Sequence, residues 1–244
     1  IYRMLLLSLF VEFVMSFFAK LFGFKQKTTA QEDVALKAAK ELEPSNETSF
    51  IELIKNRRSI YAIGNNLSQS NDEIEKLIQE AIRHSPSAFN SQSSRAVILF
   101  EQSHHKFWNT VLEVLKTIIP TEAVSGTQQK IQSFAAGAGT VLFYEDQSVI
   151  KSLQEQFELY ADNFPIWSEH STAIAQFAVW NVLAEQNIGA SLQHYNPIID
   201  EKINTSFNIP AEWKLRAQLV FGSIEGAAGE KAFIDDESRF KTFG

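Results

Sequence analysis

The sequence predicts an α+β fold with three layers, in which helices flank a mostly antiparallel central sheet. Three observations lead to this prediction. Segments with a helical repeat of apolar residues alternate along the chain with short apolar runs that are typical of buried strands. The helical segments are the longer ones, so helix predominates. A late segment, residues 213–224, alternates apolar and polar residues as a strand with one wetter face does.

The first elements of the domain are expected to be two helices. An amphipathic helix is expected to begin after Thr48 and to break within NRRSIYAIG. The segment SNDEIEKLIQEAIRHSP, which begins at Ser70, carries the strongest helical pattern of the chain. Ser70 and Glu73 are spaced as a capping box, and one apolar stripe follows at Ile74, Leu77, Ile78, Ala81 and Ile82.

The elements that follow alternate between strands and helices. The runs RAVILF at 95–100 and GTVLFYE at 139–145 are expected to be short buried strands. Gly189 is expected to stop the last long helix, because glycine readily adopts the left-handed conformation that ends helices. The helices themselves are expected at 103–117, 147–160 and 168–187.

Composition limits the classes of function. The chain has 244 residues, of which 45% are hydrophobic, enough for one domain of ordinary size. Its formal net charge of -7 disfavours nucleic acid, which requires a basic face. The absence of cysteine excludes disulfides and cysteine zinc sites and fits a reducing compartment, so a cytoplasmic location is expected. The five histidines lack metal-ligand spacing, and no metal site is expected.

The N-terminal part of the chain differs from the rest. Residues 1–24 form an almost continuous apolar run without a clean signal-peptide cleavage site, and Glu12 would lie near the centre of a membrane span. Two interpretations stay open: an anchor, for example a helix at a membrane surface, or an extension upstream of a start at Met15. Membrane contact is expected only through this segment. Residues 25–48 are polar and are expected to be a linker or an exposed helix.

Standard catalytic motifs are missing from the sequence. It contains no G-x-S-x-G, H-E-x-x-H or G-x-G-x-x-G. The stretch GAAGEK at 226–231 superficially resembles a phosphate loop, but Glu230 stands where that loop requires glycine. Composition and pattern alone therefore assign no function.

Four stretches change this when they are taken together: NRRSIYAIG, HSPSAFNSQSSR, GASLQHYNP and GEKAFIDDESRFKTFG. Their order and spacing resemble the nitroreductase family of flavoproteins. The likeness is greatest to its compact branch of NAD(P)H oxidoreductases, which are similar to the yeast fatty-acid-repression nitroreductases. The resemblance covers about residues 49–244. It implies a homodimer that binds FMN and takes electrons from NAD(P)H.

The resemblance implies where the FMN phosphate would bind. Arg57, Arg58 and Ser59 match the family's anchor for the phosphate and ribityl chain, and a planar guanidinium suits a phosphate group. The alternative is a pair of solvated arginines at a helix end. Lys231 and Arg239 match the basic residues that complete the phosphate site from the C-terminal tail. An ordinary surface of mixed charge is the alternative for this tail.

The segment after the second helix has an implied role across the dimer. In the family it crosses the subunit interface and lines the partner's flavin, where short amides and hydroxyls satisfy ring and ribityl oxygens. The matching residues are Pro86, Ser87, Ala88, Asn90 and Gln92. An ordinary Ser/Asn-rich turn is the alternative. The chain has NSQSSR where many nitroreductases have Asn-x-Gln-Pro-Trp, so their substrate specificity is not carried over.

Two further segments are implied to contact the flavin ring. Gln193, His194, Tyr195 and Asn196 match the segment along the ring, whose backbone donates to N5, where hydride enters and leaves. His194 is a weak candidate for a general acid, since hydride transfer requires none. Lys130 matches a contact to the pyrimidine edge, where a cation would stabilise reduced flavin. A solvated lysine on a helix is the alternative.

The stretch LYADNFPIWSEH is expected to form the substrate pocket. Tyr160, Phe164 and Trp167 surround a proline that is expected to break the preceding helix, which suggests a mobile aromatic wall. The resemblance implies that this wall overhangs the flavin and stacks on planar acceptors. Packing in the core is the alternative for these aromatic residues.

The function expected from the resemblance is an FMN-dependent oxidoreductase. It would use NAD(P)H to reduce nitroaromatic or quinone-type acceptors by ping-pong hydride transfer. One alternative is a flavin-binding or flavin-sequestering regulatory protein with little turnover. Another is a scaffold that attaches to membranes through residues 1–24.

Overall fold

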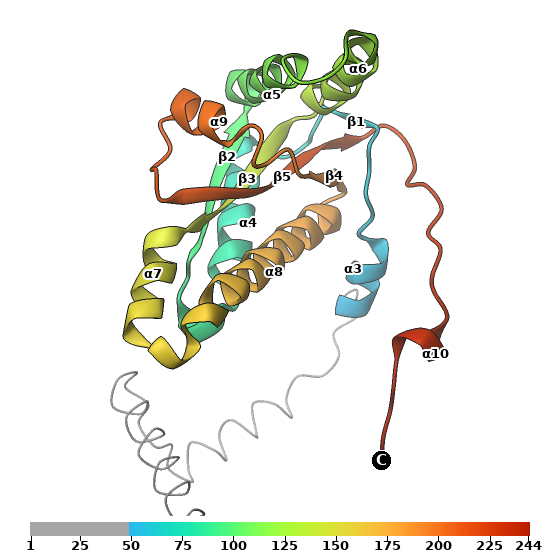
Figure 1. Cartoon of the computed structure of the whole chain (residues 1–244). Helices are drawn as coiled ribbons and strands as arrows, with labels where there is room; N and C mark the ends of the chain where they lie inside the picture. The colour runs from blue at the N-terminus through green and yellow to red at the C-terminus, as the bar shows by residue number, and fades with distance from the viewer. Residues whose placement is uncertain (1–48) are drawn as a thin grey trace, which may run out of the picture. The chain divides into compact units, whose positions relative to one another are not determined.

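The computed structural model describes residues 49–244, and the expectations for residues 1–48 lie outside the described residues (Figure 1). The α-helices are α3 (Phe50–Asn56), α4 (Asn71–Arg83), α5 (Glu101–Lys116), α6 (Val124–Ala135), α7 (Gln147–Gln156), α8 (Phe164–Glu185), α9 (Asp200–Phe207) and α10 (Asp236–Arg239). The strands are β1 (Ile63–Gly64), β2 (Ser94–Phe100), β3 (Gly139–Asp146), β4 (Ile188–Gln193) and β5 (Trp213–Ile224). Short 3-10 helices are η1 (Ala88–Asn90), η2 (Thr121–Ala123) and η3 (Glu158–Asn163).

The sheet is built around β5. This strand pairs antiparallel with β1, β3 and β4, and β2 pairs antiparallel with β3. An isolated parallel bridge joins Ser59 to Ala190 beside β4. These pairings confirm the mostly antiparallel central sheet that the sequence predicts.

Helices cover both faces of this sheet and form two separate hydrophobic clusters. Figure 1 shows α5, α6 and α9 on one side of the sheet and α4 and α8 on the other. Successive residues of β3 serve the two sides alternately, as the two-residue period of a strand requires. Leu142 and Tyr144 pack with the first group of helices, and Val141 and Phe143 pack with the second. The predicted three-layer α+β architecture is confirmed.

The helix α4 begins as its sequence predicts. The Ser70 hydroxyl accepts a hydrogen bond from the backbone N–H of Glu73 over 3.3 Å, and the Glu73 carboxylate accepts one from the backbone N–H of Ser70 over 2.8 Å. Ile74 and Ile78 are buried against the sheet. The capping box and the start of the apolar stripe are both confirmed.

Two expectations about β5 and Gly189 are wrong. Residues 217–222 of β5 are buried on both faces, because a layer of helices covers each face, so the strand has no long wet face. Helix α8 ends at Glu185, and Asn187, with φ 57°, supplies the left-handed residue near its end. Gly189 lies within β4, where a Cβ atom would come within 2.9 Å of Ile60 Cγ2.

The proline in LYADNFPIWSEH has a role opposite to the expected one. Pro165 lies in the first turn of α8, a position where its missing N–H costs nothing, and it begins this helix rather than breaking the preceding one. The preceding helix α7 ends at Gln156 and is followed by η3, so the expected helix at 147–160 is shorter than predicted. None of the helices between residues 49 and 244 combines the length and the apolar character needed to cross a bilayer.

Candidate functional site

The Arg57–Ser59 segment lies between the end of α3 and strand β4. Arg57 caps α3, and its backbone N–H donates to the carbonyl of Leu53 over 2.9 Å. Three residues later, the N–H of Ile60 donates to the carbonyl of Ala190 in β4 over 2.9 Å. Two stretches that are far apart in the sequence, NRRSIYAIG and GASLQHYNP, are therefore side by side in the fold.

The guanidinium groups of Arg57 and Arg58 have no carboxylate partners in the described part of the chain. Within residues 49–244, no ion pair involves either side chain. The Cζ atom of Arg57 lies 4.3 Å from the ring centroid of Trp180 in α8, and its Nε is buried with no hydrogen-bond partner among residues 49–244. Burial lowers the pKa of Arg57, and the charge of Arg58 lowers it further. A bound anion would offset both effects.

The C-terminal segment reaches this place with its backbone. Arg58 donates a hydrogen bond to the carbonyl of Gly229. Lys231 and Arg239 instead contact aromatic rings of their own segment: Lys231 Nζ lies 5.0 Å from the Phe233 ring and Arg239 Cζ lies 5.6 Å from the Phe240 ring. In the described part of one chain, neither basic group contacts the two arginines.

The segment expected to line the partner's flavin is a tight loop. Phe89, Asn90 and Gln92 have φ values of 57°, 51° and 48°, which are uncommon for residues with a side chain. The Ser87 hydroxyl accepts a hydrogen bond from the Gln92 backbone over 2.9 Å, and the N–H of Ala88 donates to Ser171 over 3.4 Å. Backbone strain of this kind persists only where surrounding contacts enforce it, and it is frequent at binding sites.

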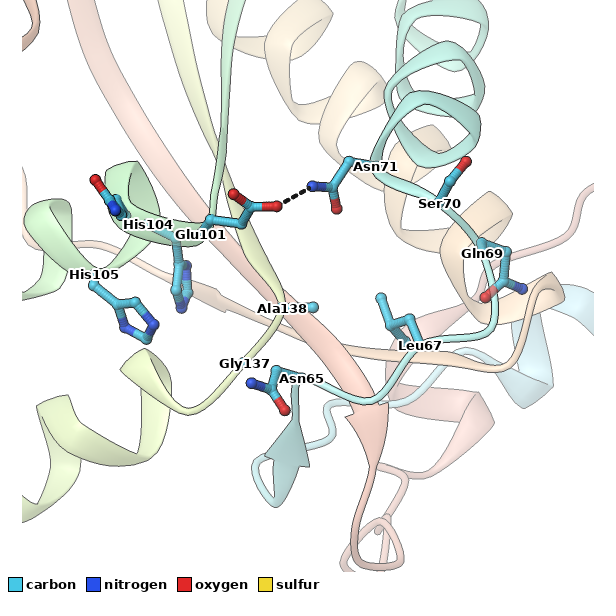
Figure 2. Close-up of a pocket in the computed structure, with 11 residues that line it drawn as sticks. Asn65, Leu67, Gln69, Ser70, Asn71, Glu101, His104, His105, Gly137 and Ala138 are labelled. Carbon is cyan, nitrogen blue, oxygen red and sulfur yellow. Dashed lines mark hydrogen bonds between the residues drawn. The ribbon is translucent and has the colours of Figure 1, made fainter.

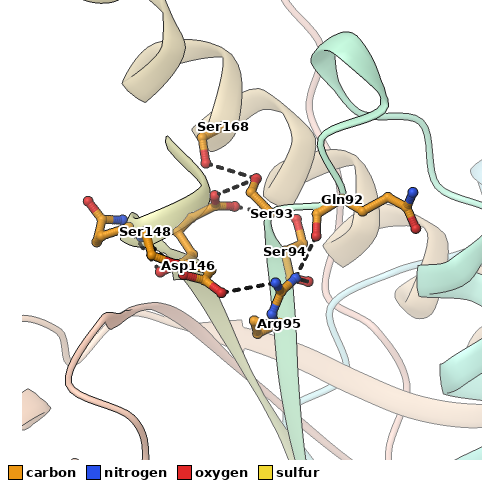
Figure 3. Close-up of polar contacts among 9 residues, drawn as sticks. Gln92, Ser93, Ser94, Arg95, Asp146, Ser148 and Ser168 are labelled. Atoms are coloured by element: carbon orange, nitrogen blue, oxygen red, sulfur yellow. Dashed lines mark hydrogen bonds and ion pairs between the residues drawn. The ribbon is translucent and has the colours of Figure 1, made fainter. Parts of the chain in front are cut away.

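Directly after this loop, two serines bind a buried carboxyl that sequence reasoning missed (Figure 3). Ser93 donates to Glu145 Oε2 over 3.0 Å, and Ser94 donates to Oε1 over 3.4 Å. The same hydroxyls lie 3.2 Å from Ser168 and 3.0 Å from Thr172, both in α8. Burial raises the pKa of Glu145 to about 7. The network joins β2, β3 and α8 beneath the loop.

A second buried polar residue fixes the turn after β4. Gln218 of β5 accepts a hydrogen bond from the backbone N–H of Tyr195 over 2.8 Å and donates to Asn196 Oδ1 over 3.2 Å. Gln193 donates to the Ser191 hydroxyl over 3.1 Å. His194 stays exposed between these anchored neighbours. Sequence reasoning found the turn and missed Gln218, which lies in the buried and otherwise apolar middle of β5, residues 217–222.

The aromatic residues of the expected substrate wall belong to one cluster with Phe89. The ring centroid of Phe89 lies 5.4 Å from that of Phe164 and 6.0 Å from that of Trp167. Phe164 is only 2% exposed, whereas Tyr160 is 40% exposed. They lie on η3 and the first turn of α8, which are helical. The cluster therefore joins the loop at 86–92 to the start of α8.

Lys130 does not join the other residues that are expected to bind FMN. It is exposed on α6, and its Nζ lies 5.9 Å from the ring of Phe134 on the same helix. Helix α6 covers the face of the sheet opposite to α8. Among residues 49–244, no ion pair involves Lys130, and its recorded contact is with Phe134 rather than with residues 57–59 or 193–196.

A separate cavity of about 490 Å³ lies between the first turns of α4 and α5 and contains none of the expected site residues (Figure 2). In it, Asn71 donates to Glu101 over 3.0 Å. The ring of His104 is held by Thr140, whose hydroxyl accepts from Trp108 over 3.0 Å and lies 2.9 Å from His104 Nδ1. Burial lowers the pKa of His104 to about 4, so this histidine is neutral and structural at neutral pH.

The comparisons with known proteins agree with the fold and with the resemblance to the family. Residues 54–223 match the family described as "Nitroreductase family". The protein HBN1 of Saccharomyces cerevisiae is 34% identical over 191 residues, which span 78% of this chain and 95% of HBN1. The nitroreductase CinD from Lactococcus lactis, solved in complex with nicotinic acid, is 51% identical with a TM-score of 0.75. The match covers 80% of this chain and 100% of CinD.

CinD has also been solved in complex with 4-nitrophenol. A more distant protein from Exiguobacterium sibiricum, solved in complex with FMN, has a TM-score of 0.61 at 14% identity. That match covers 82% of this chain and 99% of the other, and it shows a shared fold.

Proposed function

The chain belongs to the nitroreductase family, and from this premise we propose that it is an FMN-dependent oxidoreductase. It would use NAD(P)H to reduce nitroaromatic or quinone-type acceptors in a ping-pong cycle, in which the electron donor and the acceptor bind one after the other. FMN supplies the hydride chemistry, and the protein binds and orients the reactants.

The observation that carries this proposal is that two neighbouring guanidinium groups form no ion pair among residues 49–244. Arg57 and Arg58 are adjacent, have no carboxylate partner among residues 49–244, and directly precede Ser59 in the sequence. Two adjacent cations repel each other, and burial disfavours the charge of Arg57. The FMN phosphate is a dianion that would offset both costs through charge-assisted hydrogen bonds. The residues present therefore fit the cofactor.

The exposed surface of α8 supports the homodimer. Ile166, Ile174 and Phe177 are 54%, 42% and 38% exposed on this helix. Apolar side chains gathered on an exposed helix are typical of a subunit interface. In the proposed dimer, a second copy covers these side chains and contributes Ser87, Asn90 and Gln92 to the flavin site.

The proposed substrates are supported by a close relative and by an exposed aromatic residue. CinD, which is 51% identical to this chain, has been solved in complex with nicotinic acid and with 4-nitrophenol, so this relative binds a pyridine and a nitroaromatic compound. Tyr160, at 40% exposed, offers a surface on which such planar rings can stack.

An absorbance experiment tests the proposal. Purified protein is expected to be yellow, to bleach when NADH or NADPH is added, and to regain its colour when a nitroaromatic compound or a quinone follows. A stable yellow protein that neither NADH nor NADPH bleaches would instead support a flavin-sequestering protein with little turnover. A colourless protein that cannot be reconstituted with FMN would overturn the assignment of the cofactor.

A further inference from the structure

We infer that Trp180 is a positioning residue, which holds the guanidinium of Arg57 ready to bind the phosphate of FMN. This inference rests on the proposed function, because it concerns the same phosphate. It starts from one contact: the Cζ atom of Arg57 lies 4.3 Å from the centroid of the Trp180 ring. Trp180 lies in α8, and Arg57 caps the C-terminal end of α3, so the contact joins two helices.

The indole is the contact that orients the charged end of Arg57. No carboxylate pairs with Arg57 in the described chain, and its buried Nε has no hydrogen-bond partner. A cation over the face of tryptophan is attracted by the electron-rich ring. A guanidinium that lies on such a face keeps its N–H groups at its edge, where they remain free to bind phosphate oxygens.

Trp180 is itself held in place by packing. Its ring is half-buried against the hydrophobic cluster between α4, α8 and the sheet. Its Nε1 is buried and has no hydrogen-bond partner among residues 49–244, so packing holds the indole without help from a polar contact. A rigid platform reduces the freedom that Arg57 loses when the phosphate binds, and such preorganisation strengthens binding.

The neighbouring arginine is held differently. Arg58 donates to the carbonyl of Gly229, in the C-terminal segment. Its position therefore depends on that segment, whereas the position of Arg57 depends on the body of the domain. In the inferred phosphate site, Arg57 is held in a fixed position by Trp180, whereas the position of Arg58 can adjust with the C-terminal segment.

Trp180→Leu tests the inference through the ratio of two affinities. Riboflavin lacks the phosphate of FMN and is otherwise the same flavin. We expect Trp180→Leu to weaken FMN binding by about 2- to 30-fold, the range of one cation–π contact, and to leave riboflavin affinity unchanged. Trp180→Phe keeps an aromatic face and is expected to lose less. In an Arg57→Ala background, Trp180→Leu is expected to add little further loss, because the two residues act as one unit.

The matched control is Trp213→Leu. Trp213 also lies against an arginine, Arg95, whose Cζ is 5.9 Å from its ring, but Arg95 is already paired with Asp146. Neither Trp213 nor Arg95 is among the residues expected to bind FMN. The control is expected to leave the ratio of FMN to riboflavin affinity unchanged. Thermal melts of each variant separate loss of folding from loss of phosphate binding.

The possible results distinguish this inference from the proposed function. Equal losses of FMN and riboflavin affinity in Trp180→Leu would show that Trp180 is only structural and overturn the inference alone. A wild-type protein that binds FMN and riboflavin equally well would overturn the phosphate anchor, and the inference with it. A wild-type protein that binds no flavin would overturn the proposed function.

Discussion

Ser93 donates its hydroxyl to the carboxyl of Glu145, a residue that is only 1% exposed, over 3.0 Å. Ser94 donates to the same carboxyl, and Glu169 and Arg216 are the charged residues that act on it from α8 and β5. Burial outweighs these contacts and raises the pKa of Glu145 from 4.5 to about 7. The folded protein therefore holds the proton of the Glu145 carboxyl more tightly than the unfolded chain does.

The stability of the protein is expected to depend on pH through Glu145. Because the folded pKa is raised, the favourable contribution is complete below about pH 4.5 and is lost as the pH rises through about 7. Glu145→Gln removes the charge and keeps the shape. The stability of Glu145→Gln relative to wild type is therefore expected to rise by about 2–3 kcal/mol between about pH 5 and about pH 8. Urea unfolding of both proteins at each pH measures this change. Glu122→Gln, at an exposed position, is the control, and a difference that does not vary with pH would contradict the prediction.

Substitution of the basic residues is expected to weaken FMN binding unequally. Arg57→Ala removes a charge-assisted phosphate contact and is expected to cost about 1.5–3 kcal/mol of binding free energy. Lys231→Ala is expected to cost less, because Lys231 is exposed on the C-terminal segment and lies against Phe233. Titration of apo-protein with FMN measures both. Unchanged affinity in Arg57→Ala would remove this residue from the phosphate site.

Flavin binding is expected to depend on assembly. If Ser87 and Asn90 contact the flavin of the partner subunit, a monomer holds two incomplete sites, and FMN occupancy falls on dilution in parallel with dimer dissociation. Ile174→Glu places a charge on the exposed apolar side of α8 and is expected to lower both. Light scattering and flavin absorbance on the same samples give the comparison. A monomer that keeps full FMN occupancy would show that the site is complete within one chain.

The aromatic residues expected to form the substrate wall are predicted to have two different roles, one in stability and one in binding the acceptor. Phe164 is buried among Phe89, Phe157 and Trp167, so Phe164→Ala is expected to cost about 3–5 kcal/mol of stability. Tyr160→Ala, at an exposed position, is expected to change the KM for nitroaromatic acceptors with little loss of stability or of FMN. Thermal melts and steady-state kinetics distinguish the two. Similar melting temperatures for both variants would refute this division.

A chain that starts at Thr48 is expected to keep its flavin content and activity, because every residue expected to bind FMN lies downstream. If residues 1–24 are an anchor, only membrane association is expected to be lost. Flavin absorbance, turnover and co-sedimentation with lipid vesicles test the shortened chain against the full one. Loss of folding in the shortened chain would place the N-terminal residues in the core.

Local signals explain which parts of the fold could be predicted. Helix α4 has its cap and its apolar stripe within a few residues of each other, so Ser70, Glu73 and the stripe that begins at Ile74 predict it. Helix α6 has no side-chain cap and only two buried residues, Ile131 and Phe134, and its pattern did not predict a helix.

The candidate site also has parts that local sequence signals predict and parts that they do not. The motifs predicted the Arg57–Ser59 segment and the turn at 193–196, because each is continuous in the sequence. They could not predict that Ser94 would pair with Glu145, which depends on the register of β2 on β3. The contact between Arg57 and Trp180 could not be predicted either, because it depends on how α3 packs against α8.

The place of β5 in the sheet also affects the order in which the protein can form during synthesis. β5 is the last strand of the chain, yet β1, β3 and β4 all pair with it. Until residues 213–224 have left the ribosome, β3 and β4 each have an open edge, and the apolar side chains on both faces of the sheet lack their central neighbour. The nascent chain therefore completes its core late, and a chain interrupted before Trp213 would expose edges that invite aggregation.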